Sequence, residues 1–405
     1  MTAADQVVAF DPFEPGFVDS PYEQYARLRA HDPVHWSGLL DGWLLTRYDD
    51  VARVLREPSM SSDPANAIPT PAIEAERARM RDGERPPLTL VLRDDPDHAR
   101  LRTLIQAPFG ARSVEGLRDI VHARVEAALD ALIPRGAMDV IADFAYPLPV
   151  AVFCKMFGVP DEDQPQFREW TAAVARNLDP LLTEDERDRC TRLTDEMYAY
   201  LEDQIDYKRR HPGDDILTGL VHAEDRGDRL TKDELVAQVV TLYVAGHEPT
   251  TALIGSGLLA LLRHRSQLAK LRAQRDLLVS AVHEFLRYDG PNQFVRRIVT
   301  EPTRAGDRDL EPGQVVYVGI GAANRDPAHW GPDVDVVRID RPGVASHLQF
   351  GAGVHTCLGT HLARLQAEIA LDALVNRLAD IELAAEPVWS PRIVIRGLQS
   401  LPISF

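Results

Sequence analysis

Apolar residues recur at intervals of three and four over most of the chain, which places them on one face of an α-helix. The predicted helices cover residues 20–30, 47–56, 99–108, 113–133, 165–178, 185–210, 232–265 and 266–288, and a further amphipathic stretch spans 360–377. The pattern therefore predicts a mainly helical protein.

Strand-like runs of β-branched and aromatic residues are short and few. They cover residues 34–36, 43–46, 294–299, 314–318 and 392–405. Two longer stretches, 60–92 and 323–349, show neither the helical nor the strand-like spacing of apolar residues. Irregular segments of that length in a compact protein usually carry function. We expect small β-sheets on a mostly α body, with the irregular segments flanking a binding site.

No linker rich in Gly, Ser or Pro divides the 405 residues, so we predict one domain over 1–405. Its smaller β-rich part is formed from about 30–60, 290–320 and 385–405.

Composition and charge exclude several classes of protein. The formal net charge of −17 argues against a nucleic-acid partner. No apolar run approaches the roughly 20 residues that span a bilayer, and the N-terminus lacks a signal pattern. Three unevenly scattered cysteines, Cys154, Cys190 and Cys357, fit a reducing compartment. We expect a cytoplasmic protein without a membrane partner.

One of these cysteines stands in a glycine-rich loop. Residues 350–359 read FGAGVHTCLG, directly before the predicted helix 360–377. The positive end of a helix dipole stabilises a thiolate, so we expect Cys357 to ionise easily and to bind a soft metal. Zinc is the competing metal, but zinc sites need several Cys or His at short spacing, and the other cysteines lie far away.

The flanking residues suggest a large, flat partner for the sulfur. Gly351, Gly353 and Gly359 remove side chains where the backbone must approach such a group, and Phe350 offers an apolar cover. The ten-residue string resembles the haem-ligand loop of the cytochrome P450 family, Phe-Gly-x-Gly-x-His/Arg-x-Cys-x-Gly.

The resemblance extends over nearly the whole chain. It implies a triangular prism in which haem b lies between a long central helix and the cysteine helix. Cys357 would be the metal ligand, and Phe350, His355 and Gly359 would contact the cofactor.

The stretch 232–265 predicts the central helix, on the order of 50 Å long, with a capping box of Thr231 and Glu234 at its start. Pro249 lies inside it. Proline lacks an N–H and presses on the carbonyl four residues earlier, here Ala245, so we expect the helix to open at this turn.

Residues 245–251, AGHEPTT, resemble the oxygen-binding groove of the family. Ala245 and Gly246 would lie beside the haem, and Glu248 matches the family's proton-relay acid. Pro249 stands where the family usually has threonine, and Thr250 is rotated by about 100° from that position on an ideal helix. Glu248 and Thr250 are therefore the catalytic candidates, with ordered water or a substrate hydroxyl as alternatives to Thr250.

Two further groups match the family by their positions. Glu284 and Arg287 resemble its structural Glu-x-x-Arg pair, which a further arginine completes; Arg338–Arg341 contains the candidates. The residues that resemble the contacts of the haem propionates are His98, Arg102, Arg297 and His355.

Candidate pocket positions mix apolar residues with amides, which suits a medium-sized, partly polar natural product. They are Leu88, Leu90, Val91, Leu242, Asn292, Gln293, Phe294, Val295, Leu398 and Gln399.

The resemblance implies a haem-thiolate monooxygenase that uses O2 to hydroxylate or epoxidise a secondary metabolite. Since no part of the chain resembles a flavin or iron–sulfur domain, two electrons would come from a separate ferredoxin and its NAD(P)H-dependent reductase. Arg100, His361 and Arg364 are candidate docking residues.

Three other functions remain open. Oxidative coupling of aromatic or indole substrates, such as cyclodipeptides, needs no oxygen insertion and so fits the missing threonine. A peroxygenase would use hydrogen peroxide. A haem-based gas sensor or carrier would bind a ligand without turnover.

Overall fold

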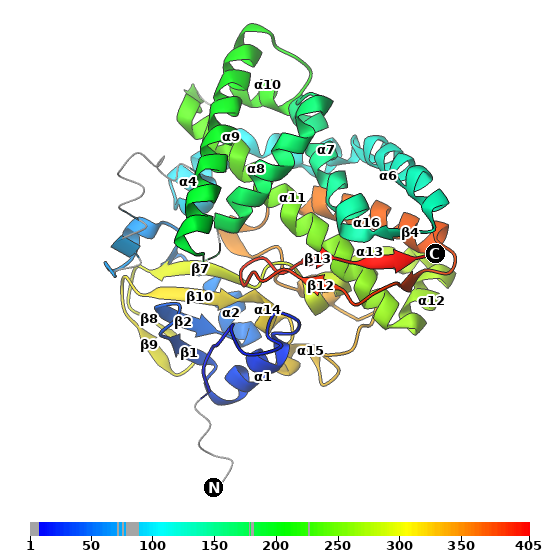
Figure 1. Ribbon diagram of the computed structural model, residues 1–405. Coiled ribbons are helices and arrows are strands. Elements are labelled where there is room, and N and C mark those ends of the chain that lie inside the picture. The colour runs from blue at the N-terminus through cyan, green and yellow to red at the C-terminus, as the bar shows by residue number, and fades with distance from the viewer. Residues whose placement is uncertain are drawn as a thin grey trace.

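The computed structural model describes residues 8–70, 73–74, 77, 89–177, 179, 182–225 and 227–405. Helices dominate, and the strands gather mainly toward one side (Figure 1). The helices are α1 (Tyr22–His31), α2 (Tyr48–Val54), α4 (Asp97–Ile105), α5 (Ala111–Glu115), α6 (Arg118–Leu132), α7 (Pro147–Phe157), α8 (Gln164–Asn177), α9 (Glu184–Arg210), α10 (Ile216–Val221), α11 (Lys232–Arg263), α12 (Arg265–Ala273), α13 (Leu278–Asp289), α14 (Ile320–Ala323), α15 (Pro327–Trp330) and α16 (Thr360–Arg377).

Most predicted helices are present, but two are interrupted. The stretch 113–133 divides between α5 and α6, and 266–288 divides into α12 and α13 around a short 3₁₀ turn, Arg275–Leu277. Helix α7 was not predicted, because almost every one of its residues is buried and no polar face is left to show the helical spacing. A six-residue π-helix, η5 (Val140–Ala145), leads into α7.

One five-stranded sheet joins the N-terminal part of the chain to the segment after α13. Its strand order is β1 (Val34–Ser37), β2 (Gly42–Leu45), β10 (Val315–Gly319), β7 (Phe294–Val299) and β3 (Met60–Ser61). β10 pairs in parallel with β2 and antiparallel with β7. This sheet lies at the lower left of Figure 1, away from α6 and α16.

The C-terminal segment forms short strands instead of one long strand. β13 (Leu398–Ser400) pairs with β12 (Val388–Trp389), and β14 (Pro402–Ser404) lies between β11 (Glu382–Leu383) and β4 (Ala137–Asp139). The residues between β12 and β13 are irregular and lie near α11, where an added Cβ on Gly397 would lie 3.1 Å from Cβ of Ala252.

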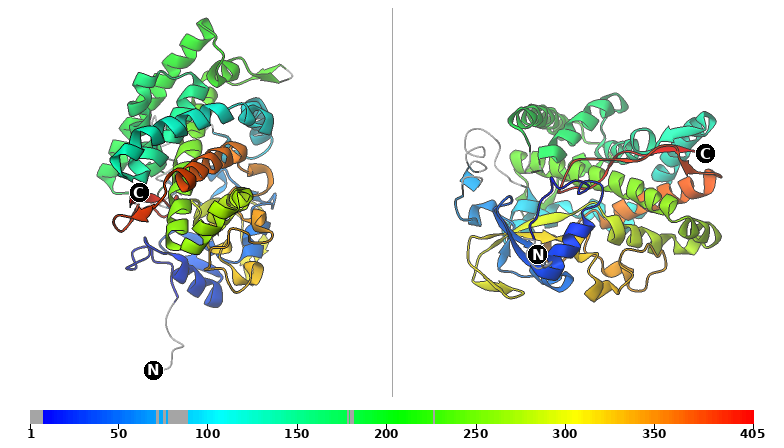
Figure 2. Two further views of the ribbon diagram at one scale, coloured as in Figure 1. Left: turned by 90° about the vertical axis from the view of Figure 1, so that its right-hand side faces the viewer. Right: turned by 60° about the horizontal axis from the view of Figure 1, so that its bottom comes forward.

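The long helix α11 runs through the middle of the molecule (Figures 1 and 2). It packs against α7, α8, α9, α13 and α16. Its capping box is present as predicted, with Thr231 N donating to Glu234 Oε2 at 2.9 Å and Glu234 N to Thr231 Oγ1 at 3.2 Å. The prediction that Pro249 opens the helix is wrong, because α11 is continuous across it. Proline still leaves the Ala245 carbonyl without its donor.

One stretch among the described residues, Val140–Phe157, is long and apolar enough to cross a membrane, contrary to the expectation that no run approaches this length. It comprises η5 and α7, and 72% of it is buried inside the molecule. The stretch therefore belongs to the core against which α11 packs.

Candidate active site

The cysteine loop is held by its own backbone. Cys357 N donates to Phe350 O at 2.8 Å, and the Thr360 hydroxyl donates to Cys357 O at 2.9 Å. Gly353 has a φ of +74°, and an added Cβ would lie 2.7 Å from Leu55 O. Glycine is therefore required there by the backbone and by a close approach to the residues after α2. At Gly359, by contrast, the nearest atom to an added Cβ is Cys357 Sγ at 4.0 Å.

The Cys357 thiol does not ionise easily on its own, which corrects the expectation from the helix dipole. Burial raises the pKa of this thiol, and the Gly359 N–H and the Thr360 hydroxyl offset that effect only in part. Desolvation thus outweighs the helix terminus. Cys357 nevertheless stays exposed, although it lies among many protein atoms. The two observations describe a sulfur that the protein surrounds but leaves accessible.

On α11, one residue is exposed where its neighbours are buried. Ala245 is exposed, whereas Leu242, Tyr243 and Val244 before it are buried. Gly246 lies next to Ala245 but faces α7, because an added Cβ would lie 1.9 Å from Cζ of Phe153. The two residues therefore differ in their surroundings, and their contact with the haem stays a prediction.

The hydroxyls of both threonines in the same turn donate hydrogen bonds to backbone carbonyls. Thr250 Oγ1 donates to Gly246 O at 2.9 Å, and Thr251 Oγ1 donates to Ala145 O at 3.2 Å. Thr250 is buried within the continuous helix α11, so its hydroxyl does not stand where the family usually has the threonine that Pro249 replaces.

Glu248 is buried and paired. Its Oε2 accepts a hydrogen bond at 2.9 Å from Arg392, which lies between β12 and β13. Next to it, His247 is buried against the ring of Tyr146, with the ring centroids 4.3 Å apart. Burial lowers the pKa of His247 to about 4, although Glu248 opposes that shift.

The four predicted propionate residues come from three segments and meet beside the cysteine loop. The rings of His98 and His355 lie 4.2 Å apart, and Arg102 donates to Val354 O at 3.2 Å. Burial lowers the pKa of His355 to about 4, and the nearby Arg297 lowers it further. Sequence positions as distant as 98 and 355 thus share one basic cluster.

Two buried members of this cluster are only partly paired. Nδ1 of His98 lies 3.4 Å from Asp95 Oδ1, which leaves its other ring nitrogen. His98 is 2% exposed, and its Nε2 has no hydrogen-bond partner in the described part of the chain. Arg297 is 8% exposed, donates to the carbonyl of Arg296, and forms no ion pair with any described residue. A buried guanidinium without an ion pair and a buried imidazole nitrogen without a hydrogen-bond partner are suited to an acidic ligand.

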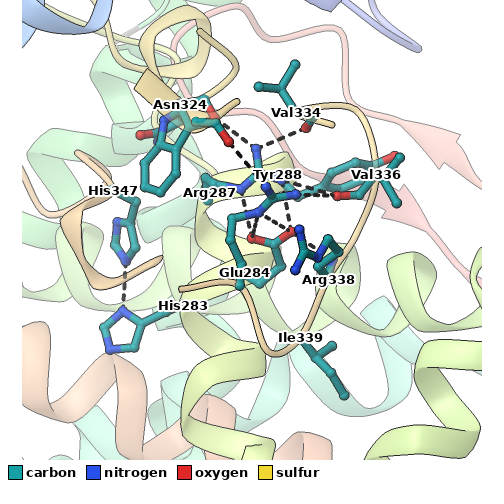
Figure 3. Close-up of polar contacts among 12 residues, drawn as sticks. His283, Glu284, Arg287, Tyr288, Asn324, Val334, Val336, Arg338, Ile339 and His347 are labelled. Carbon is teal, nitrogen blue, oxygen red and sulfur yellow. Dashed lines mark hydrogen bonds and ion pairs between the residues drawn. The ribbon is translucent and has the colours of Figure 1, made fainter. Parts of the chain in front are cut away.

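The Glu-x-x-Arg pair lies at the centre of a buried network (Figure 3). Glu284 Oε2 accepts from Arg287 Nε at 2.7 Å, and both oxygens of Glu284 accept from Arg341 Nε at 3.2 Å. Arg341 therefore completes the network. Arg338 instead pairs with Asp333 at 2.7 Å and reaches Glu284 through its backbone N–H.

This network is connected to the cysteine loop. Arg287 donates to Asn324 O at 3.0 Å, and Asn324 Oδ1 accepts from Leu348 N at 2.9 Å. A pair of histidines supports the same segment, with His283 Nδ1 and His347 Nε2 3.0 Å apart (Figure 3).

The predicted pocket residues do not all lie in comparable surroundings. Leu88 lies outside the described residues. Phe294 packs in an aromatic cluster with Phe10 and Tyr25. Gln293 is buried against Gly321, because a Cβ added to Gly321 would lie 2.2 Å from Gln293 Oε1. We leave Gln293 and Phe294 out of the proposed pocket.

The remaining positions differ in exposure. The buried ones are Leu90, Leu242 and Leu398; the partly or fully exposed ones are Val91, Asn292, Val295 and Gln399. Leu90 is tied to the central helix, because its N–H donates to Gln238 Oε1 at 3.0 Å.

The three predicted docking residues differ in whether their side chains already form ion pairs. Arg100 forms ion pairs with Glu234 and Asp228, so its charge is neutralised. Arg364 pairs with Glu368 at 3.1 Å, whereas His361 is exposed. Sequence reasoning missed Val354, which is 60% exposed on the cysteine loop itself.

Three features together define the class of this protein. They are a cysteine in a loop held by backbone hydrogen bonds, a long central helix, and a buried network of one glutamate and two arginines. The family model described as Cytochrome P450 matches residues 89–379, and the chain belongs to that family. Membership implies a haem-iron cofactor, redox partners and a small-molecule substrate, and the protein is an oxidoreductase.

Related proteins support the assignment over the full length. Cytochrome P450 107B1 of Saccharopolyspora erythraea is 39% identical over 402 residues, 96% of each chain. The cytochrome P450 monooxygenase PikC of Streptomyces venezuelae is 40% identical and covers 99% of this chain and 95% of its own.

Solved structures agree with the fold. Ligand-free CYP164A2 of Mycobacterium smegmatis has a TM-score of 0.89 at 35% identity, covering 97% of this chain and 98% of its own. P450BioI in complex with an acyl carrier protein has a TM-score of 0.88 at 33% identity, covering 96% and 98%. The predicted fold class and family are therefore confirmed.

Proposed function

We propose that the protein binds haem b through Cys357 and uses O2 to hydroxylate or epoxidise a medium-sized secondary metabolite. The observation that carries this proposal is the basic cluster of His98, Arg102, Arg297 and His355, because the free Nε2 of His98 and the buried Arg297, which has no ion pair among the described residues, fit the two propionates of a haem. The exposed sulfur of Cys357 and the room at Gly359 fit the same cofactor.

The haem supplies oxygen activation when bound, and the thiolate ligand favours cleavage of the O–O bond. The chain's own residues have three roles in this proposal. Cys357 is the ligand, and the small side chain of Ala245 leaves space on the oxygen side. Glu248 holds and passes protons, while Thr250 keeps its hydroxyl bonded inside α11.

The substrate class rests on the relatives and on the pocket composition. Similar proteins include a polyketide biosynthesis cytochrome P450 of Bacillus subtilis and a vitamin D(3) 25-hydroxylase of Pseudonocardia autotrophica. We propose a pocket in which the apolar side chains of Leu242, Val295 and Leu398 face the substrate and the amides of Asn292 and Gln399 orient it.

The electrons are proposed to come from a ferredoxin and its NAD(P)H-dependent reductase in the cytoplasm. Val354 offers an exposed apolar contact next to the ligand. The exposed Arg56 lies on the neighbouring segment, with its Cα 3.2 Å from a Cβ added to Gly353. An acidic ferredoxin would be attracted to this positive charge on an otherwise acidic protein.

The cofactor assignment is tested by the spectrum of the reduced protein with carbon monoxide. A thiolate ligand gives a red-shifted Soret band, which we expect in the wild type and in a Cys190→Ala control. Cys357→Ala should lose it. A colourless protein, or a band indifferent to Cys357, contradicts the proposal.

Oxidative aromatic coupling is the second candidate, favoured by Pro249 and by the internal bond of Thr250. Mass spectrometry of turnover products separates the two functions, because a gain of one oxygen excludes pure coupling. Turnover with hydrogen peroxide and no ferredoxin would instead favour a peroxygenase. A non-catalytic sensor or carrier is set aside, because the chain belongs to an enzyme family.

A further inference from the structure

A glutamine near the start of the central helix holds the backbone of a segment that is distant in the sequence. Gln238 Oε1 accepts a hydrogen bond from Leu90 N at 3.0 Å. Gln238 is 0% exposed and Leu90 is 5% exposed, so this hydrogen bond is shielded from solvent. Because little water can replace the glutamine there, loss of its oxygen would leave a buried N–H without a partner.

Gln238 lies on the face of α11 that leads to the proposed oxygen side of the haem. Gln238, Leu242 and Ala245 follow one another at spacings of four and three residues, which places them on one face of the helix. Ala245 is exposed, whereas the other two are buried. Since Ala245 is seven residues after Gln238, the segment that Gln238 holds lies about 10 Å along α11 from Ala245.

That segment is a single 3₁₀ turn, η2 (Leu90–Leu92). At its start, Thr89 Oγ1 accepts a hydrogen bond from Val91 N at 3.4 Å. Leu90 packs into the main hydrophobic core, whereas Val91 is 48% exposed. The hydrogen bond to Gln238 therefore fixes where this turn stands against α11.

The residues that follow η2 are held by contacts that do not involve Gln238. Asp94, two residues after the turn, accepts from Ser62 N at 2.8 Å. Arg100 of α4 pairs with Glu234, one turn before Gln238 on α11. Helix α4 also carries two members of the basic cluster. Loss of the Gln238 oxygen is therefore expected to release η2 and to leave the proposed propionate contacts in place.

We infer that Gln238 is a positioning residue for substrate specificity, because it holds η2 as the far wall of the proposed substrate space, about 10 Å from Ala245 along α11. The inference rests on the proposed function, which puts haem and substrate beside Ala245. It narrows the proposed substrate to a molecule that is compact along the direction of α11.

The test uses ligands of graded length on the ferric holoenzyme and needs neither the natural substrate nor the electron donor. The probes are imidazole, 4-phenylimidazole and 4-(biphenyl-4-yl)imidazole, and each offers an imidazole nitrogen to the iron. Titration at the Soret band gives the Kd of each probe. The Kd of the biphenyl probe divided by that of the phenyl probe measures the cost of the added ring.

Gln238→Leu and Gln238→Met both remove the oxygen acceptor with little change in side-chain volume, and either one serves if the other does not fold. Gln238→Glu keeps an oxygen acceptor. Gln366→Leu is the matched control, because Gln366 of α16 is also 0% exposed and its amide has no hydrogen-bond partner in the described part of the chain.

We expect Gln238→Leu and Gln238→Met to lower the biphenyl-to-phenyl ratio by about fivefold or more, because the wall yields to the longer probe. The Kd of imidazole should not change, since this probe does not reach η2. Gln238→Glu and Gln366→Leu should keep the ratio of the wild type.

Amide hydrogen exchange at Leu90 measures the hydrogen bond itself and needs no ligand. Mass spectrometry with fragmentation resolves this amide. It should exchange about tenfold faster or more in Gln238→Leu than in the wild type, because the N–H has lost its acceptor. Gln238→Glu and Gln366→Leu should retain the slow exchange.

Unchanged exchange at Leu90 in Gln238→Leu overturns the inference, because the glutamine then does not hold the turn. Faster exchange with an unchanged or higher biphenyl-to-phenyl ratio also overturns it, since η2 then does not limit the ligand. An equal fall of the ratio in Gln366→Leu has the same consequence. In all these cases imidazole still shifts the Soret band of the wild type. A wild type without that shift would instead remove the proposed function.

Discussion

Two helical glycines show how differently one residue type constrains this chain. Gly246 on α11 touches the ring of Phe153, where an added Cβ would lie 1.9 Å from Cζ. Gly219 on α10 has no atom within 4 Å of an added Cβ. Alanine favours a helix at both positions, so only packing distinguishes them.

We expect Gly246→Ala to destabilise the protein by about 1–3 kcal/mol, because the Phe153 ring must move within a packed core. Gly219→Ala should stabilise it by about 0.5–1 kcal/mol through helix propensity. Urea unfolding of both variants measures the difference. Equal effects of the two substitutions would contradict the close packing of α11 on α7.

The buried His247 leads to a second prediction, on how the stability of the protein depends on pH. Burial lowers its pKa to about 4 from an ordinary value of 6.5. The unfolded chain therefore takes up a proton below pH 6.5 that the folded protein refuses. The contribution of neutral His247 to stability is complete above pH 6.5 and is lost as pH falls from 6.5 toward 4.

His247→Phe keeps an aromatic contact with Tyr146 and removes the titration. The free energy of unfolding should then depend less steeply on pH between 6.5 and 4.5, by about 1.4 kcal/mol per pH unit at most. Denaturant unfolding at several pH values measures this slope. A control, His361→Phe, alters an exposed histidine and should leave the slope unchanged.

At the scale of elements, sequence patterns predicted most helices and strands, but they missed one buried helix and gave a wrong result at Pro249. Continuous apolar runs such as α7 escaped detection, since a helix buried on all sides has no period to find. The local effect of Pro249 was overestimated, because packing on both sides of α11 keeps the helix intact. The pairing of Glu248 with Arg392 had no sequence signal, because the two residues are 144 positions apart.

The Glu284 network could be predicted as a pair, while its third member had to come from the structure. The side chain of Arg341 is 3% exposed and reaches Glu284, Asp333 and three backbone carbonyls in the segment 330–336. Arg338 is 42% exposed and pairs only with Asp333 by its side chain in the described region. Burial therefore distinguishes two arginines that the sequence left equivalent.

We expect Arg341→Met to cost about 3 kcal/mol, because it leaves buried acceptors without a donor. Arg338→Met should cost less than about 1 kcal/mol, as is usual for an exposed ion pair. Urea unfolding compares the two variants, and the Soret band reports haem retention. Since Asn324 links the network to the cysteine loop, haem should also be lost more readily from Arg341→Met.

At the scale of the whole molecule, charge is distributed unevenly. The chain carries a formal net charge of −17, yet the exposed Arg56 lies next to the cysteine loop, close to the exposed Val354. Sequence reasoning chose Arg100 for docking, and its two acidic partners could not be seen without the fold. A local positive patch on an acidic protein attracts an acidic partner at long range and is screened by salt.

This distribution predicts how the protein accepts electrons. The rate of reduction by an acidic ferredoxin should fall by roughly tenfold or more between low and physiological ionic strength, because screening removes the steering. Val354→Asp adds a negative charge next to the cysteine loop. This charge repels an acidic ferredoxin and should slow reduction further. Arg100→Gln should have little effect, because the charge of Arg100 is already paired. Stopped-flow reduction under carbon monoxide measures all three rates, and a salt-independent rate with an unaffected Val354→Asp variant would place the electron donor on another face.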